Sequence, residues 1–291
     1  MSAEVEAART VFHALAREKG ASGRRRMLVA LVVCAAVLVA VVVAGALLAG
    51  AATETDFAQK NLAPSAAHLF GTDWMGRDMF ARTMAGLATS LGVGLAAAAV
   101  SSVVALAMAL IAAFGGRVGD AVVSWLIDLM MGIPHIVLLI LVSYALGRGA
   151  VGVTAGIALT HWGSLARVLR AEILQCRERP YVAVARALGA TRLRIARDHM
   201  LPYVLPQYIV GLVLLFPHAI LHEASITFLG FGLSPEQPAI GVILSESMSY
   251  LSAGMWWLAV FPGAALVACV LMFDRIGSLA RRLADARSSQ E

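Results

Sequence analysis

Few side chains in the apolar part of this sequence can do chemistry, and several of them are histidines. His218 and His222 are four residues apart in the apolar stretch Tyr203–Phe228, and His161 lies in the apolar stretch before it. On a helix, this spacing places both imidazoles on one face. With His161 from a neighbouring helix, they would suit a borderline metal such as nickel or zinc. The alternatives are hydrogen bonds between helices, stacking on Trp162, and contact with a peptide or a metal chelate.

Three more ionisable groups lie in apolar stretches. Asp128 and His135 belong to the stretch Ala121–Leu146, and Glu223 directly follows His222. Such groups are functional candidates by default, because their desolvation inside a membrane must be compensated. We include Asp128 and Glu223 with His161, His218 and His222 as candidates for a substrate path, and we expect Asp128 to pair with a cation or a hydroxyl group.

Prolines interrupt three of the apolar stretches, at Pro134, Pro217 and Pro262. A proline inside a helix removes a backbone hydrogen bond and frees a carbonyl group. Freed carbonyls are tolerated within a membrane where they line a cavity. A packing kink is the alternative interpretation at each position.

The composition is that of an integral membrane protein. Of the 291 residues, 60% are hydrophobic and only 14% are charged, whereas a soluble domain carries about a quarter charged residues. The net charge of +5 does not require a nucleic-acid partner, since cytoplasmic segments of membrane proteins are rich in Lys and Arg. Cys34, Cys176 and Cys269 are far apart and indicate neither a disulfide framework nor a zinc site.

We expect six membrane-spanning helices. The stretch Met27–Ala52 runs for 26 residues without a charge, which is long enough to cross a bilayer with some tilt, and we interpret it as an uncleaved anchor. The other five stretches are about Leu87–Phe114, Ala121–Leu146, Val151–Leu165, Tyr203–Phe228 and Met255–Phe273. The fourth is short, so we expect it to continue through Arg167.

The distribution of positive charge predicts the orientation. With the N-terminus inside, the cytoplasmic segments hold 19 of the 23 Lys and Arg residues and the outer segments hold 4, so both termini are expected in the cytoplasm. The chain then divides into a cytoplasmic segment (1–26), an anchor helix (27–52), an external loop (53–86), a five-helix core (87–277) containing a cytoplasmic coupling loop (171–202), and a cytoplasmic tail (278–291).

One basic segment, Tyr181–Pro202, is too charged to cross the membrane. Its pattern predicts two short helices, Tyr181–Leu188 and Thr191–Met200, with Gly189 supplying the backbone freedom for a sharp turn. Pro202 is expected to close the segment just before the next apolar stretch. We call this segment the elbow and expect it on the cytoplasmic side.

The elbow resembles the EAA loop of the membrane subunits of binding-protein-dependent ABC importers. That loop reads roughly E-A-A, three residues, G, nine residues, I-x-L-P. Here the glutamate is missing and His199 replaces the Ile. The resemblance implies contact with an ATPase subunit through Ala183, Val184, Ala185, Arg186, Gly189, Ala190, Leu201 and Pro202.

A second resemblance lies in the external loop. Its sequence GTDWMGRDMFARTMAG is similar to the G-T-D-x-x-G-R-D-x-x-S-R-x-x-x-G signature of the C-type permeases of the peptide and nickel ABC importers. The signature residues that we single out are Gly71, Asp73, Gly76, Arg77, Asp78 and Arg82. Asp73, Arg77 and Asp78 are expected to form a compact charge network, either as a structural external cap or in contact with substrate.

Two later segments extend the similarity to this family. The run from His222 to Gly232 resembles its E-A-x-L-S-F-L-G-L-G sequence, and the run from Trp256 to Gly263 resembles its W-W-x-x-x-F-P-G opening of the sixth span. The family implies an all-α fold with six spans and a type I ABC importer core, in the inner membrane of a prokaryote.

The resemblance also implies partners. These are a second, homologous permease subunit, two ATPase subunits, an extracytoplasmic substrate-binding protein and membrane lipid. The chain has no GxxxxGK[ST] motif, so we expect no enzyme activity in it and assign ATP and Mg²⁺ to the ATPase subunits. No cofactor and no nucleic acid are expected.

The cargo expected from the histidines is nickel, free or chelated. Histidines at His218 and His222 and a His-Trp pair at His161 are similar to the nickel-type C subunits, and they would bind the metal only transiently. Import of dipeptides or oligopeptides by the same machinery is the alternative. A second alternative is an ion-coupled secondary transporter or channel that uses these groups as a relay.

Overall fold

The computed structural model describes the backbone of residues 2–284 and the side chains of residues 25–282. The end of the predicted cytoplasmic tail, residues 285–291, and the side chains of most of the predicted segment 1–26 lie outside the described residues. The described part is helical, without strands. Its main helices are α1 (Ser2–Leu47), α2 (Met79–Phe114), α3 (Gly116–Gly132), α4 (His135–Ala145), α5 (Ala150–Arg177), α6 (Pro180–Ala187), α7 (Arg192–Ile195), α8 (Leu201–Phe228), α9 (Ile240–Leu251) and α10 (Trp257–Ala284).

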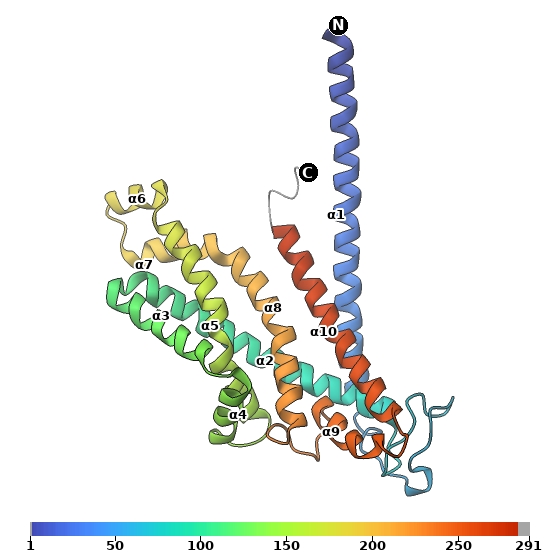
Figure 1. Ribbon diagram of the computed structural model, residues 1–291. Helices are drawn as coiled ribbons and strands as arrows, with labels where there is room; N and C mark the ends of the chain where they lie inside the picture. Colours follow the sequence, from blue (N-terminus) through green and yellow to red (C-terminus); the bar gives the residue numbers. More distant parts are fainter. Residues whose placement is uncertain (1, 285–291) are drawn as a thin grey trace.

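Helix α2 is the centre of the molecule. It packs against α1, α3, α5, α8 and α9, and it runs from the external loop to the end where α3 and α7 lie (Figure 1). Its contact surface is made of small residues, among them the fully buried Ala97, Ala105 and Ala109. A Cβ added at Gly94 would lie 2.6 Å from Cγ1 of Ile220 on α8. Small side chains therefore allow the close helix approach on which packing in a membrane depends.

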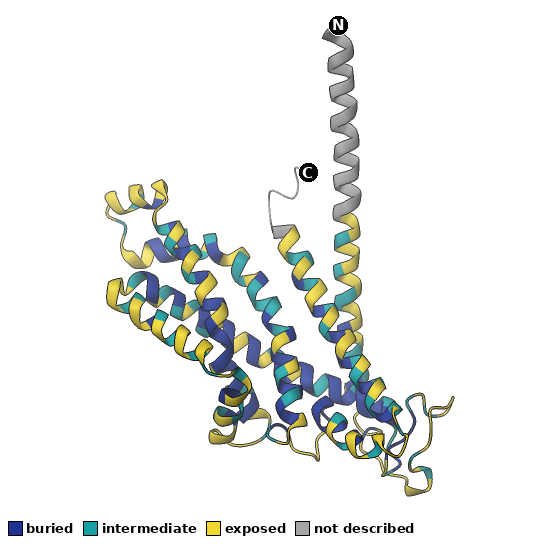
Figure 2. Cartoon of the chain, in the orientation of Figure 1, coloured by how far each residue is buried: buried dark blue, intermediate teal, exposed yellow. Residues whose placement is uncertain are grey.

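The outer surface of the helices is apolar, as expected for contact with lipid. Val32, Val39 and Leu47 on α1 are exposed, as are many apolar residues on other helices, and Figure 2 shows exposed residues along the outer faces. A protein surrounded by water rarely exposes so much apolar surface. These faces are suited to the hydrocarbon interior of a bilayer.

Length and hydropathy identify fewer spans than six. Among the described residues, four helices qualify, Arg25–Leu47, Met79–Phe114, Arg192–Phe228 and Trp257–Arg282, and the α3–α4 pair makes five if it counts as one broken span. Helix α5 is long enough with 28 residues but is not among them, since its second half carries arginines. It does continue past Arg167, as the sequence indicates. Six spans and cytoplasmic termini remain predictions.

The third predicted span is not one helix, which corrects the sequence-based expectation. Helices α3 and α4 meet at a break of Ile133 and Pro134 and are bent by 100°. Pro134 has no N–H and disfavours helical geometry in the residue before it, and Ile133 is extended. The break places His135 at the first position of α4.

Helix α9 was not predicted. Its 12 residues follow the fifth span and pack against α8, α10 and α2. Ile240 and Ile243 are fully buried, so the helix is part of the core, and its Glu246 pairs with Arg77 of the external loop. It is too short to cross a bilayer as a helix.

The elbow has the predicted turn but a different end. Gly189 has a φ of +82°, a conformation that favours glycine, and it separates α6 from α7. After α7 the chain forms one π-helical turn, Ala196–Met200, and passes directly into α8. Pro202 therefore does not close the segment. It lies in the first turn of α8, directly after the π turn.

Substitution of Gly94 tests the close approach of α2 and α8. We expect Gly94→Val to lower the midpoint temperature of unfolding of the purified chain, because overpacking a helix contact costs about 1–3 kcal/mol. Gly92→Val is the matched control, since a Cβ at Gly92 meets no atom within 4 Å. Equal midpoints for the two variants would contradict the close packing.

Candidate functional site

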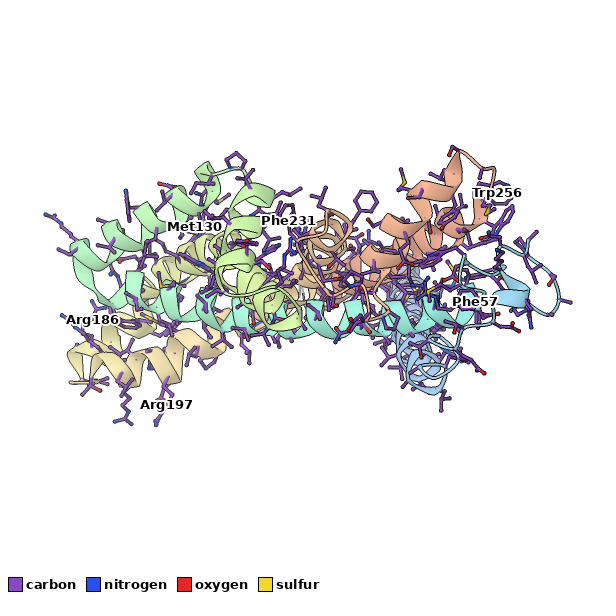
Figure 3. All side chains as sticks on the ribbon, turned by 90° about the horizontal axis from the view of Figure 1, so that it is seen from below. Phe57, Met130, Arg186, Arg197, Phe231 and Trp256 are labelled. Atoms are coloured by element: carbon purple, nitrogen blue, oxygen red, sulfur yellow. The ribbon has the colours of Figure 1, made fainter. Side chains whose placement is uncertain are left out.

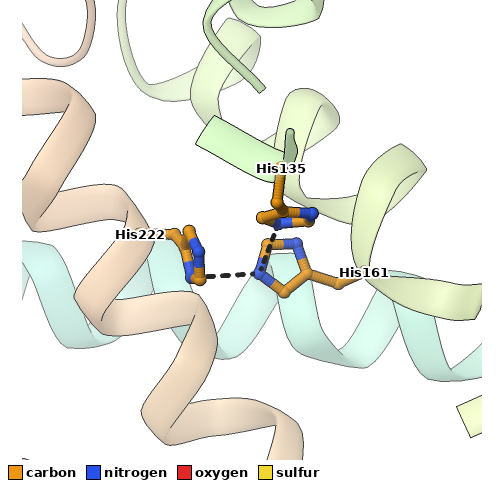
Figure 4. Close-up of side chains that lie close together, drawn as sticks. All are labelled: His135, His161 and His222. Atoms are coloured by element: carbon orange, nitrogen blue, oxygen red, sulfur yellow. Dashed lines mark hydrogen bonds between the residues drawn. The ribbon is translucent and has the colours of Figure 1, made fainter. Parts of the chain in front are cut away.

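Three histidines from three helices meet inside the molecule. His135 on α4, His161 on α5 and His222 on α8 place ligand atoms within 4.8 Å of one another (Figure 4). Nε2 of His161 lies 3.3 Å from Nε2 of His135 and 3.4 Å from Nδ1 of His222. The rings pack edge to face, with centroids 4.3 to 4.8 Å apart. We call these three residues the histidine cluster.

Backbone carbonyls orient two of the three rings. Nδ1 of His161 lies 3.1 Å from the carbonyl oxygen of Ile157, and Nδ1 of His222 lies 2.7 Å from that of His218. An imidazole that donates from Nδ1 carries its lone pair on Nε2. For His161 this lone pair points at the other two rings (Figure 4).

The cluster borders a cavity of about 400 Å³. The cavity is lined by Met130, Met131, Ile133, His135, Thr160, His161, Gly163, Ser164, Leu215, His218 and His222. All three histidines singled out from the sequence therefore lie at one cavity. His218, however, does not belong to the cluster, and the predicted set of His161, His218 and His222 is corrected at that position.

His135 takes the place of His218 because of the helix break before it. The sequence identified His135 as an ionisable group in a span, but a continuous helix gave no reason to join it to His161. One turn before His222, His218 uses its carbonyl group to hold the His222 ring, and His218 also lines the cavity.

The two predicted carboxylates do not line this cavity. Glu223 is fully buried and accepts a hydrogen bond from Thr227, one turn farther along α8, at 2.9 Å. Asp128 pairs with Arg167 at 2.8 Å, and their side chains are 72% and 51% exposed. The expected cationic partner of Asp128 is therefore Arg167, on the exposed surface of α3 and α5.

A buried ion-pair network holds the external loop. The Asp73 carboxylate lies 2.7 Å from Nε of Arg77 and 2.5 Å from Nη1 of Arg82, and Glu246 on α9 lies 2.9 Å from the same Arg82 nitrogen. Asp73 and Arg82 are almost fully buried. The backbone N–H groups of Met75 and Arg77 also donate to Asp73. Glu246 is more than 160 residues away in sequence, and no local motif indicated it.

Asp78 has a different role from the one expected. It takes no part in the Asp73 network and instead caps α2, because its Oδ1 accepts from the N–H of Ala81 at 2.9 Å. Its other oxygen lies 2.8 Å from Nδ1 of His68. Gly71 and Gly76 have φ values of +74° and +76°, so the signature glycines form the turns between these charged groups.

The elbow is anchored on one side and exposed on the other. Val182 and Ile195 are buried, and the Tyr181 hydroxyl lies 3.2 Å from the Cys176 sulfur, a hydrogen bond that raises the pKa of Tyr181 to about 12. Nη1 of Arg177 donates to the carbonyl of Ala113 at the end of α2. The Tyr181 contact joins the elbow to α5, and the Arg177 contact joins that end of α5 to α2.

The free side of the elbow combines apolar and basic residues. Leu188 and Leu193 are 82% and 80% exposed, and Val184 is also exposed. Arg186 and Arg197 project from the end opposite Phe57 and Trp256 (Figure 3). Of the residues predicted for coupling, Ala183, Val184, Arg186, Gly189 and Pro202 are exposed, and Ala185, Ala190 and Leu201 are half-buried.

Comparison with known proteins identifies the family. The family described as the binding-protein-dependent transport system inner membrane component matches residues 105–287. This chain belongs to that family. The match covers α3 to α10 and thus includes the elbow and the histidine cluster.

Relatives of this permease are named for peptide transport. A peptide permease protein of Brucella suis biovar 1 is 36% identical over 81% of this chain and 78% of its own length. A dipeptide transport system permease protein of Bacillus subtilis is 32% identical over 75% of this chain and 68% of its own length. These names support membership of the peptide and nickel group, and none of them supports nickel as the cargo.

A solved structure has the same fold. The permease resembles a chain in the crystal structure of an amino acid ABC transporter, with a TM-score of 0.55 and 19% sequence identity, over 69% of this chain and 94% of that one. The all-α permease fold expected from the sequence is thereby confirmed.

The Asp73 network should be essential to the stability of this permease. We expect Asp73→Asn to destabilise the chain by about 3 kcal/mol, because it leaves the buried Arg82 guanidinium without its closest partner. Asp128→Asn removes a carboxylate from an exposed pair and should cost less than about 1 kcal/mol. The midpoint temperatures of the two purified variants test this. A midpoint no lower for Asp73→Asn than for Asp128→Asn would contradict a stabilising role for the network.

Proposed function

We propose that this permease is one of two membrane subunits of an ATP-driven importer of small peptides in the inner membrane of a prokaryote. The relatives named as peptide and dipeptide permeases support the peptide cargo, in place of the nickel expected from the sequence. The family supports dependence on a substrate-binding protein. A second, homologous permease subunit would complete the translocation path.

The free side of the elbow is the observation that supports dependence of transport on an ATPase subunit. A segment with four arginines and an aspartate between Arg186 and Asp198 does not enter lipid, yet it exposes Leu188 and Leu193 almost completely. Apolar side chains in such a position are typical of a protein–protein contact. We propose that this face binds a cytoplasmic ATPase subunit, which binds ATP and Mg²⁺.

The elbow is connected to the cavity through two helices. Helix α5 contains His161 and ends at Arg177, just before the elbow. Helix α8 begins at the end of the elbow and contains His222. Movement of the ATPase subunits would thus be transmitted along both helices to the residues that border the cavity. The anchoring contacts of Val182 and Ile195 keep the elbow from moving independently of this core.

The external loop would present a fixed surface to the binding protein. Its charged groups pair within the molecule, because Arg82 pairs with both Asp73 and Glu246. We propose that the signature is a structural cap and not a substrate contact. In this arrangement both termini lie in the cytoplasm and the external loop lies on the opposite side.

Coupling should depend on the backbone conformation of Gly189. We expect Gly189→Val to abolish peptide-stimulated ATP hydrolysis in the assembled transporter, since a β-branched residue is strained at a φ of +82°. Gly189→Asn should retain most of it, because Asn tolerates positive φ. The test is ATPase activity of the reconstituted complex, with assembly checked by co-purification. Full stimulation in the valine variant would contradict this role of the turn.

The cargo can be determined by uptake. In cells that express the complete transporter, we expect ATP-dependent uptake of a radiolabelled dipeptide and no uptake of radioactive nickel supplied without a peptide. Cells with a transporter that lacks this chain are the control for other uptake systems. Uptake of nickel alone, without peptide uptake, would refute the proposed cargo. Uptake that persists without the ATPase subunits would instead indicate an ion-coupled transporter.

A further inference from the structure

We propose that the histidine cluster is a transient binding site for a divalent transition metal ion that the peptide cargo carries as a chelate. His135, His161 and His222 supply three imidazole ligands, and the peptide supplies the rest. This inference rests on the proposed function for its cargo. The metal site itself is testable without transport.

The spacing of the nitrogens suits a metal of this size. With bonds of 2.0–2.1 Å and tetrahedral angles, two imidazole nitrogens on one zinc ion lie about 3.4 Å apart. The two closest pairs in the cluster are separated by 3.3 and 3.4 Å, and all three ligand atoms lie within 4.8 Å. Small rotations of the side chains would bring the third pair to the same spacing.

The surroundings orient the key ligand. His161 is buried, and its Nδ1 faces the carbonyl of Ile157 at 3.1 Å. Histidines that bind metals commonly donate their other N–H to such a carbonyl group, which fixes the ring and leaves the second nitrogen for the ion. Nε2 of His161 is the atom closest to both other histidines.

The same geometry makes the site weak, as a transport site must be. Nδ1 of His222, the atom nearest His161, is engaged with the carbonyl oxygen of His218 at 2.7 Å. Binding of a metal through this atom displaces that hydrogen bond and requires the ring proton to move from Nδ1 to Nε2. The cost lowers the affinity and allows release.

Chemistry of the cavity selects borderline metals. No Asp or Glu is among the described residues that line it, while Met130 and Met131 add thioethers to the imidazoles. Hard cations such as Mg²⁺ and Ca²⁺ require oxygen ligands, whereas imidazole suits Zn²⁺, Ni²⁺ and Cu²⁺. The lining therefore disfavours the common hard cations.

The absence of a carboxylate in this lining also indicates how the ion arrives. Three neutral imidazoles leave both positive charges of the ion uncompensated, and an uncompensated charge is costly in a medium of low dielectric constant. A peptide that binds the metal through its carboxylate or through deprotonated amide nitrogens supplies the missing negative charge. The open cavity of about 400 Å³ leaves room for such a ligand.

The first test uses Co²⁺, supplied with an equimolar dipeptide that provides the missing negative charge, as a spectroscopic probe with the purified full-length chain. We expect Co²⁺ to bind in a one-to-one ratio with absorption bands of a nitrogen-rich tetrahedral site. His161→Gln keeps a hydrogen-bonding side chain but should weaken binding at least about tenfold. His218→Ala, at the same cavity but outside the cluster, should keep the site. Failure of wild-type protein to bind Co²⁺, or equal binding by the Gln variant, would overturn the proposal.

The second test concerns the cargo and uses the reconstituted transporter. Uptake of a histidine-containing dipeptide is compared with uptake of its Ni²⁺ complex, and the ratio of the two rates is measured. We expect His161→Gln to lower the ratio of complex to free peptide about tenfold relative to wild type. An unchanged ratio would overturn the role of the site in transport. If wild type imports neither form, the proposed function fails, while the Co²⁺ measurement still decides the metal site.

Discussion

Close packing along α2 is the constraint on which the rest of this structure depends. Lipid is as apolar as leucine, so burial of apolar side chains gives little driving force for helix association in a membrane, and tight contact must replace it. The buried alanines of α2 and the approach of Gly94 to Ile220 provide that contact. Helices α5 and α8, which bear His161 and His222, both pack on α2. The relative position of these two histidines is therefore set by side chains that have no chemical role.

The break at Pro134 adds the third histidine to this frame. Because α4 starts at His135 and turns by 100° from α3, the first residue of a new helix reaches a cavity that a straight span would pass by. Backbone irregularity within a membrane is tolerated where it is buried in protein or lines a cavity. Here Ile133 and His135, on either side of the proline, both line the cavity, so the irregular segment and the histidine cluster belong to one structural feature.

Much of the fold and part of the site could be predicted from the sequence, because local patterns determine them. The apolar stretches, the turn at Gly189 and the charged external loop follow from residue types alone. Contacts between distant segments could not be predicted in the same way. Glu246 reaches Arg82, the partner of Asp73, only after α9 has packed against α2, and His135 replaces His218 in the cluster only because of the helix break. The spacing of four residues between His218 and His222 predicts that both lie on one face of a helix. It does not predict which of the two contacts a histidine on a neighbouring helix.

Because the second half of the elbow is continuous with α8, a movement of the elbow would be transmitted along the helix to His222. From Arg192 to His222 the chain is helical without a gap, and the 30 steps between these residues add up to a path of about 45 Å at 1.5 Å per residue. A tilt of about 5° at the elbow would displace the His222 end by up to roughly 4 Å. Metal coordination tolerates deviations of only about 0.2 Å. A rotation too small to open a wide pore would therefore be enough to switch a site of this kind from holding an ion to releasing it.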